Sequence, residues 1–97
     1  MFLKVHRSRD IGDVVAVCDR ELLNKTISHE KLSLTITEAF YGNTPATEEE
    51  VRGALKSAGN INLIGEHSVN IAIEMGLVTK SGCMMIGDVP HAQVYRL

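Results

Sequence analysis

The chain has 97 residues, a formal net charge of −2 at pH 7, 44% hydrophobic residues and 4% aromatic residues. This length suffices for one small domain and excludes two, and the apolar content excludes a disordered polar tail. Nucleic-acid-binding domains usually carry a basic excess, so any nucleic-acid contact has to come from a local patch.

Cysteine usage and hydropathy indicate a cytoplasmic protein. Cys18 and Cys83 stand far apart, which is typical of two free thiols in a reducing compartment rather than of a disulfide-rich secreted domain. The longest apolar run, residues 14–18, is much shorter than the roughly 20 residues of a membrane span. Lys4 and His6 follow the first residues at once, so we expect neither a signal-peptide core nor a membrane partner.

The first half of the chain predicts a strand, a helix and a second strand. Residues 2–7 alternate weakly, which indicates a strand. Residues 10–24 predict a helix, with Asp10 as its N-cap. Apolar residues recur there at the spacing of one helix face, at Ile11, Val14, Val15, Cys18 and Leu22. Residues 31–40 alternate clearly and predict a strand with one wet face, which the segment 41–43 ends.

The second half predicts two helices and the remaining strands. Thr47 and Glu50 have the spacing of a capping box, and Gly59 ends the helix that they begin. Residues 60–64 alternate briefly before Gly65, and residues 66–75 predict a third helix that Gly76 ends. Residues 83–86 and 91–96 are the last two strand candidates.

Helices and strands are interspersed over a single domain, residues 1–97. The strands alternate in polarity, whereas those of a doubly wound parallel sheet would be apolar throughout. We therefore predict an α+β fold, a two-layer sandwich in which three helices pack mainly on one face of a mixed β-sheet.

Three segments in this order and spacing carry a family resemblance. They are Glu-Ala-Phe-Tyr-Gly at 38–42, Asn-Leu-Ile-Gly-Glu at 62–66 with Ala-Ile-Glu-Met-Gly-Leu-Val at 72–78, and Gly-Asp-Val-Pro-His-Ala at 87–92. Over nearly its whole length the chain resembles the archaeal domain-of-unknown-function family numbered 424. The resemblance implies a small archaeal cytosolic α+β protein, no established activity and no catalytic residues. The family's genes tend to lie near translation genes, which implies an association with RNA or the ribosome.

Two segments are candidate binding sites. Free amides at the start of the third predicted helix could hold an anion, and Gly65 would let it approach. Alternatively, Gly65 only turns the chain and Glu66 complements the helix dipole. Pro90 fixes the backbone before His91, whose charge can change near neutral pH, so this histidine suits proton transfer, a phosphate contact or a structural turn. The candidate residues are Asn62, Gly65, Glu66, His67, Pro90 and His91.

Basic residues near the amino terminus form a weaker nucleic-acid candidate. Arg96 would join them if the two terminal strands paired, but strand alternation splits the patch, and a solvated surface is the alternative. The residues are Lys4, Arg7, Arg9 and Arg96. Apart from Phe40 and Tyr41 there are few platforms for base stacking.

Metal, cofactor and thiol chemistry have little support. No two of the possible metal ligands have the spacing of a metal-binding motif, so we expect no metal and no cofactor. These residues are Glu66, His67, Cys83 and His91. Neither cysteine has a nearby histidine that would activate it, and Cys18 should be inert core.

Three hypotheses for function stay open. The first is a non-enzymatic accessory module of translation or RNA metabolism that binds RNA or a protein partner through the wet sheet face and the loops at Gly65 and Pro90. The second is a small-molecule or anion-binding enzyme with a pocket between Gly65-Glu66 and His91. The third is a structural homodimer that pairs through an exposed edge strand at either terminus.

Overall fold

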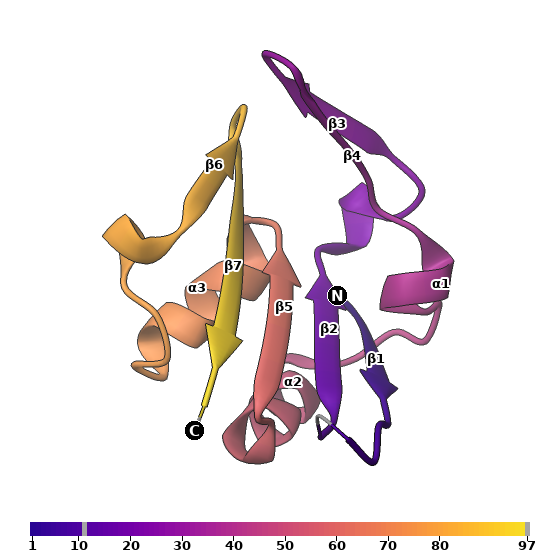
Figure 1. Cartoon of the computed structure of the whole chain (residues 1–97), viewed down its shortest axis with the longest axis vertical. Coiled ribbons are helices and arrows are strands. Elements are labelled where there is room, and N and C mark those ends of the chain that lie inside the picture. Colours follow the sequence, from indigo (N-terminus) through magenta and orange to yellow (C-terminus); the bar gives the residue numbers. More distant parts are fainter. Residues whose placement is uncertain (11, 97) are drawn as a thin grey trace.

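The computed structural model describes residues 1–10 and 12–96. Figure 1 shows a five-stranded sheet with two helices behind it and a separate two-stranded hairpin at one end. Only the neighbours β2 and β5 are parallel; the other pairs are antiparallel. In spatial order the sheet consists of β1 (Phe2–His6), β2 (Val14–Cys18), β5 (Asn60–Ile64), β7 (Val89–Tyr95) and β6 (Met84–Ile86). The predicted α+β class, with a mixed sheet, is confirmed.

Each face of the sheet has its own apolar cluster. Helices α2 (Glu48–Ser57) and α3 (Glu66–Glu74) supply the first cluster, in which they meet Val17 and Leu63 of the central strands. The second cluster lies on the opposite face, beneath α1 (Glu38–Tyr41) and the hairpin of β3 (Thr26–His29) and β4 (Leu32–Thr35). Two short 3-10 turns, η1 (Arg20–Leu22) and η2 (Lys80–Gly82), complete the chain.

The capping box predicted at the start of α2 is confirmed. The Thr47 hydroxyl accepts from the Glu50 amide at 3.1 Å, and the Glu50 carboxylate accepts from the Thr47 amide at 3.0 Å. Val51 and Leu55 are fully buried on the inner side of this helix. The local signal and the buried stripe therefore agree, and the helix ends directly before Gly59.

The helix predicted over residues 10–24 is wrong, because residues 14–18 form strand β2. This strand lies between β1 and β5, and its residues Val15, Ala16, Val17 and Cys18 are at most 3% exposed. A strand that is covered on both faces is apolar at every position, so it shows no alternation and mimics one face of a helix. Ile11, which also suggested the helix, lies outside the described residues.

The strand predicted over residues 31–40 is only partly correct. Its alternating part forms β4, but residues 38–41 form α1, which Thr37 caps by accepting from the Phe40 amide at 3.3 Å. Strand β3 was not predicted. It reaches β4 through a turn in which Glu30 has a φ of +56°. Glutamate rarely adopts this backbone conformation, so the turn could not be predicted from the sequence.

Candidate functional site

The face of the sheet turned away from α2 and α3 is covered only in part, and we call its polar portion the open face. Cross-strand neighbours point to the same side, so two rows can be followed across the sheet. One row joins Lys4, Ala16, Asn62 and Gln93, and the next joins His6, Val14, Asn60 and Tyr95. With His91, two residues before Gln93 on β7, the open face consists of Lys4, His6, Asn60, Asn62, His91, Gln93 and Tyr95.

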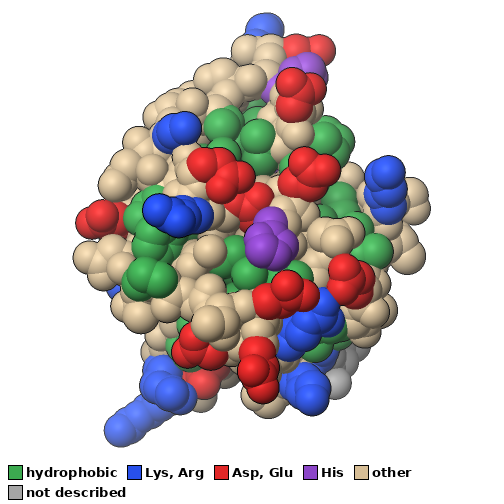
Figure 2. Space-filling view, turned by 180° about the vertical axis from the view of Figure 1, so that it is seen from behind, with side chains coloured by type: hydrophobic (Ala, Val, Ile, Leu, Met, Phe, Trp, Pro, Cys, Tyr) green, Lys and Arg blue, Asp and Glu red, His purple; other side chains and the backbone are tan. Residues whose placement is uncertain are grey.

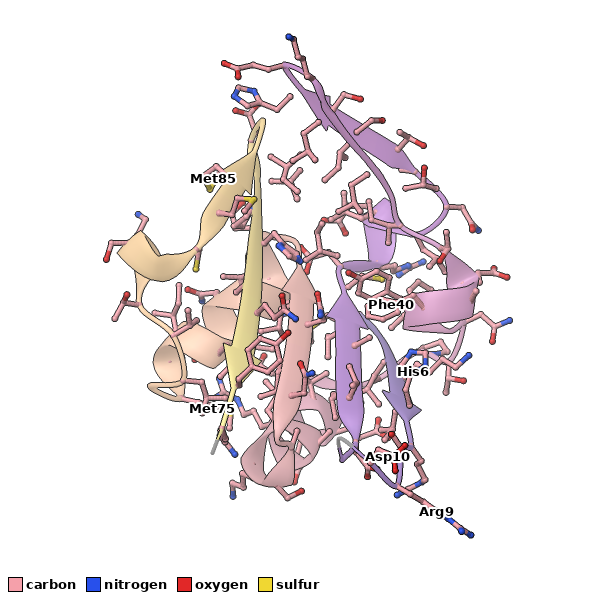
Figure 3. All side chains as sticks on the ribbon, viewed as in Figure 1. His6, Arg9, Asp10, Phe40, Met75 and Met85 are labelled. Atoms are coloured by element: carbon pink, nitrogen blue, oxygen red, sulfur yellow. The ribbon has the colours of Figure 1, made fainter. Side chains whose placement is uncertain are left out.

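The open face carries no acidic side chain at its described strand positions, although the chain as a whole has a net charge of −2. It carries aromatic rings at two places. Tyr95 is 67% exposed on β7. His6 stacks on Phe40 of α1, with ring centroids 5.0 Å apart and planes 24° from parallel, and Figure 3 shows the two rings side by side.

A pocket of about 320 Å³ lies where the hairpin and α1 meet the upper part of this face. None of its lining residues is charged at neutral pH, since burial lowers the pKa of His91 and keeps its ring neutral. The polar groups are those of Thr35, Asn62 and His91. The walls are apolar and aromatic and consist of Leu32, Leu34, Phe40, Tyr41, Met84 and Ile86.

Asn62 and His91 form a hydrogen-bonded pair in this pocket. Nε2 of His91 lies 3.1 Å from Oδ1 of Asn62, and because Oδ1 can only accept, Nε2 carries the proton. A neutral ring then leaves Nδ1 as an acceptor. Within the described chain neither Nδ1 of His91 nor Nδ2 of Asn62 has a hydrogen-bond partner, and neither atom is sealed from solvent. The pair therefore offers one donor, on Asn62, and one acceptor, on the side of the His91 ring that points away from Asn62.

The start of α3, predicted as an anion site, is occupied by a carboxylate of the chain itself. Asp19 is 3% exposed, and it accepts from the His67 amide at 2.9 Å and from the Ser68 amide at 2.8 Å. The Ser68 hydroxyl donates to the same carboxylate at 2.7 Å. These are the amides on which the expectation of an anion site rested, so a free anion would have to displace Asp19.

Gly65 is required by this arrangement. Its φ is +110°, and a Cβ atom at this position would lie 2.2 Å from Cγ of Asp19. Its amide donates to the Pro90 carbonyl at 2.9 Å. The structure therefore supports close backbone approach at Gly65, but the approaching group is a side chain rather than a ligand.

The pocket expected between Gly65-Glu66 and His91 does not form in the described structure. Gly65 does reach Pro90, but side chains alternate along β7, so Pro90 faces α3 and His91 faces the other way. Glu66 and Pro90 line one groove beside α3. Glu66 also lies with His67 in an acidic hollow that Asp19 and Glu21 complete, and His91 lines neither of the two. Figure 2 shows this far side of the molecule, where acidic side chains surround a histidine.

The basic residues do not form the single patch that was considered. The order of the sheet separates β1 from β7 by two strands, so Arg96 cannot join Lys4. Arg96 instead donates to the Lys56 carbonyl at the end of α2, at 2.6 Å. Arg7 pairs with Asp13 at 3.1 Å, and Arg9 is exposed at the tip of the loop after β1 (Figure 3).

Of the two terminal strands of the homodimer hypothesis, β1 is an outer strand that is covered along part of its length, and β7 is not an edge. Ala46 donates its amide to the carbonyl of Met1 at 2.8 Å, and Leu3 donates to Thr44 at 3.4 Å, so the segment after α1 lies along β1. Strand β7 lies between β5 and β6. The outer strands of the five-stranded sheet are therefore β1, which the segment after α1 covers at residues 1–3, and β6.

Metal binding, thiol reactivity and membrane insertion can be checked for residues 1–10 and 12–96. No three His, Cys, Asp or Glu side chains there converge in the way that metal ligands do. Burial raises the pKa of the Cys18 thiol to about 11, and Cys83 is half-buried. No helix in the same range has the length and apolar character needed to cross a membrane.

Sequence reasoning missed Asp19, Asn60, Gln93 and Tyr95 as residues of interest. Asp19 lies within residues 10–24, for which the sequence predicts a helix that the structure does not contain. An acidic residue directly after a five-residue apolar strand is the signal that could have found it, because strand ends and helix starts often meet in mixed sheets.

The fold and the open face define a small α+β protein with a half-uncovered mixed sheet. The model of the family described as a protein of unknown function (DUF424) matches residues 6–97, and the chain belongs to this family. The chain is also similar to an uncharacterized conserved protein from Methanopyrus kandleri, whose crystal structure has a TM-score of 0.79 and 27% sequence identity. That match covers 97% of this chain and 89% of the other. The comparison with curated proteins finds no similar sequence.

Proposed function

We propose that this protein is a non-enzymatic accessory module of RNA metabolism that binds single-stranded RNA across its open face. The observation that carries the proposal is that this face gathers aromatic, amide and imidazole side chains and has no carboxylate at its strand positions. Sheets that present aromatic side chains can stack two or three bases, and amides and imidazoles can bind their edges. A negatively charged backbone meets no repulsive group among these positions.

The distance between the two aromatic positions of the open face allows each of them to stack a different base. His6 and Tyr95 lie at opposite ends of one row that crosses β1, β2, β5 and β7. Three strand spacings of ~4.8 Å put these two positions roughly 14 Å apart. Asn60 lies between them, with its side-chain oxygen buried. The separation supports one stacked base at each end of the row.

The electrostatic part of the binding should be small. Lys4 is the one cation among the strand positions of the open face, and its ammonium group donates to the Ala39 carbonyl at 3.0 Å. For one or two neutralised phosphates on a single strand, log K against log salt should have a slope of about −0.7 to −1.4. Most of the affinity should come from stacking, at ~1–3 kcal/mol per base.

The test measures fluorescence anisotropy of labelled single-stranded RNA at several salt concentrations. We expect Tyr95→Ala to weaken binding by roughly 5- to 150-fold, the loss of one stacked base, and Tyr95→Phe to keep it. Asn70→Ala, on the exposed side of α3, is the control and should change nothing. No binding by the unaltered protein at low salt, or equal binding by the two Tyr95 variants, would contradict the proposal.

A protein partner is the competing outcome. A pull-down from archaeal lysate, with and without RNase, separates the two. RNA that is recovered with the protein, and translation proteins that are lost after RNase treatment, would support the proposed association with translation. A partner protein that remains after RNase treatment, with no RNA recovered, would favour a protein-binding module.

A further inference from the structure

The pocket beneath the hairpin opens on the face that we propose to bind RNA. Asn62 belongs both to the open face and to the lining of this pocket, so the two surfaces are continuous. We infer that the pocket takes one unstacked base of a bound single-stranded RNA, held by hydrogen bonds to Asn62 and His91 between apolar and aromatic walls. This inference rests on the proposed function.

The size and the walls of the pocket suit a flat aromatic ring. Its volume of about 320 Å³ lies at the lower end of the range for small-molecule sites. Phe40 and Tyr41 meet edge to face, with centroids 4.9 Å apart, and both rings line the pocket. Met84, which is 58% exposed, lines it from β6, and a thioether packs well against aromatic rings.

The polar groups offer both kinds of hydrogen bond that nucleobases make. Nδ2 of Asn62 can donate and Nδ1 of His91 can accept, while the bond between Oδ1 and Nε2 at 3.1 Å holds the two side chains in place. Every nucleobase carries both donors and acceptors on its edges, so Asn62 and His91 could each bind a different atom of one base. An apolar side chain of a protein partner would fill the walls but leave this pair without partners, which costs free energy. The pocket should therefore favour bases without selecting one strongly.

Two neighbouring methionines give a matched pair of variants. Met84 and Met85 are 58% and 53% exposed, but they point to opposite sides of β6. Met84 lines the base pocket, and Met85 lines a separate groove beside α3. Met84→Trp should fill the pocket, whereas Met85→Trp adds the same bulk elsewhere. Asn62→Ala, with Asn70→Ala on the exposed side of α3 as its control, tests the hydrogen bonds without added bulk.

The first measurement uses labelled RNA in which one position at a time is abasic. In the unaltered protein and in Met85→Trp, one abasic position should weaken binding roughly tenfold more than its neighbours do, as expected for the loss of one bound base. In Met84→Trp this position-specific loss should disappear. The second measurement follows the Asn62 side-chain amide signals by NMR during titration with adenosine or uridine, with ribose as the blank.

The outcomes separate this inference from the proposed function. If the protein binds RNA but Met84→Trp and Asn62→Ala behave as their controls do, the base pocket is refuted and the proposed function stands. If RNA does not bind but nucleosides shift the Asn62 signals, and Met84→Trp abolishes the shift, the pocket is a nucleobase site and the proposed function falls. If neither RNA nor nucleosides bind, both are refuted.

Discussion

Removing the Asp19 side chain should destabilise the protein more than any other change of an exposed or capping carboxylate. Three donors at the start of α3 bind this carboxylate, which is 3% exposed. A hydrogen bond to a charged group contributes ~1.5–3 kcal/mol. The three bonds share one carboxylate and are not additive. The acidic hollow beside Asp19 would also let water reach the freed amides. We therefore expect Asp19→Ala to cost about 3 kcal/mol, the lower value for two such bonds.

Urea denaturation followed by circular dichroism measures this loss. For a domain of this size, about 3 kcal/mol corresponds to a fall in the melting temperature of roughly 12–24 °C. Asp19→Asn keeps the shape of the side chain but turns an amide NH₂ towards backbone donors. Its loss of unfolding free energy should therefore lie between zero and that of Asp19→Ala. Asp13→Ala is the control, because its ion pair with Arg7 is exposed and should contribute less than ~1 kcal/mol. Equal unfolding free energies for Asp19→Ala and Asp13→Ala would refute this account of the cap.

Three further predictions concern stability. Gly65→Ala should lower the unfolding free energy by about 3 kcal/mol or more, because the new Cβ would lie 2.2 Å from the carboxyl carbon of Asp19. Its control is Gly53→Ala, at a helical position with open space around it, which should stabilise the protein by ~0.5–1 kcal/mol in the same urea titration. Thr47→Ala should cost about 1 kcal/mol because it removes the capping box of α2, and a change in the melting temperature below 2 °C would contradict this. Burial raises the pKa of Cys18 to about 11 and of Tyr41 to about 12. The unfolded chain loses these protons first, so stability should fall as the pH rises above about 9. Cys18 alone should account for about 1 kcal/mol at pH 10, and Cys18→Val should remove that part of the pH dependence.

Signals that act within a few residues were predicted well. Thr47 and Glu50 identify the start of α2 because a capping box needs only four consecutive residues. The start of α3 after Gly65 and the alternation of β5 were also recognised, since turn chemistry and strand period are local properties. The α+β class follows from the order of such elements.

Properties that depend on distant segments were not predicted. Residues 14–18 read as a helix face until β1 and β5 are seen on either side of them. The role of Asp19 depends on amides 48 and 49 positions further along the chain. Asn62 and His91 were both singled out as candidates, but only the pairing of β5 with β7 brings their side chains together on the open face.

Neighbouring residues are enough to identify the family, the α+β class and the two main helices, because motifs, caps and periodic patterns are properties of short segments. Which polar groups meet depends on how distant segments pack. Sheet order moved Arg96 away from the amino-terminal strand, and alternation along β7 turned His91 away from Glu66 and towards Asn62. Both results follow from long-range strand pairing, whose register no single segment specifies.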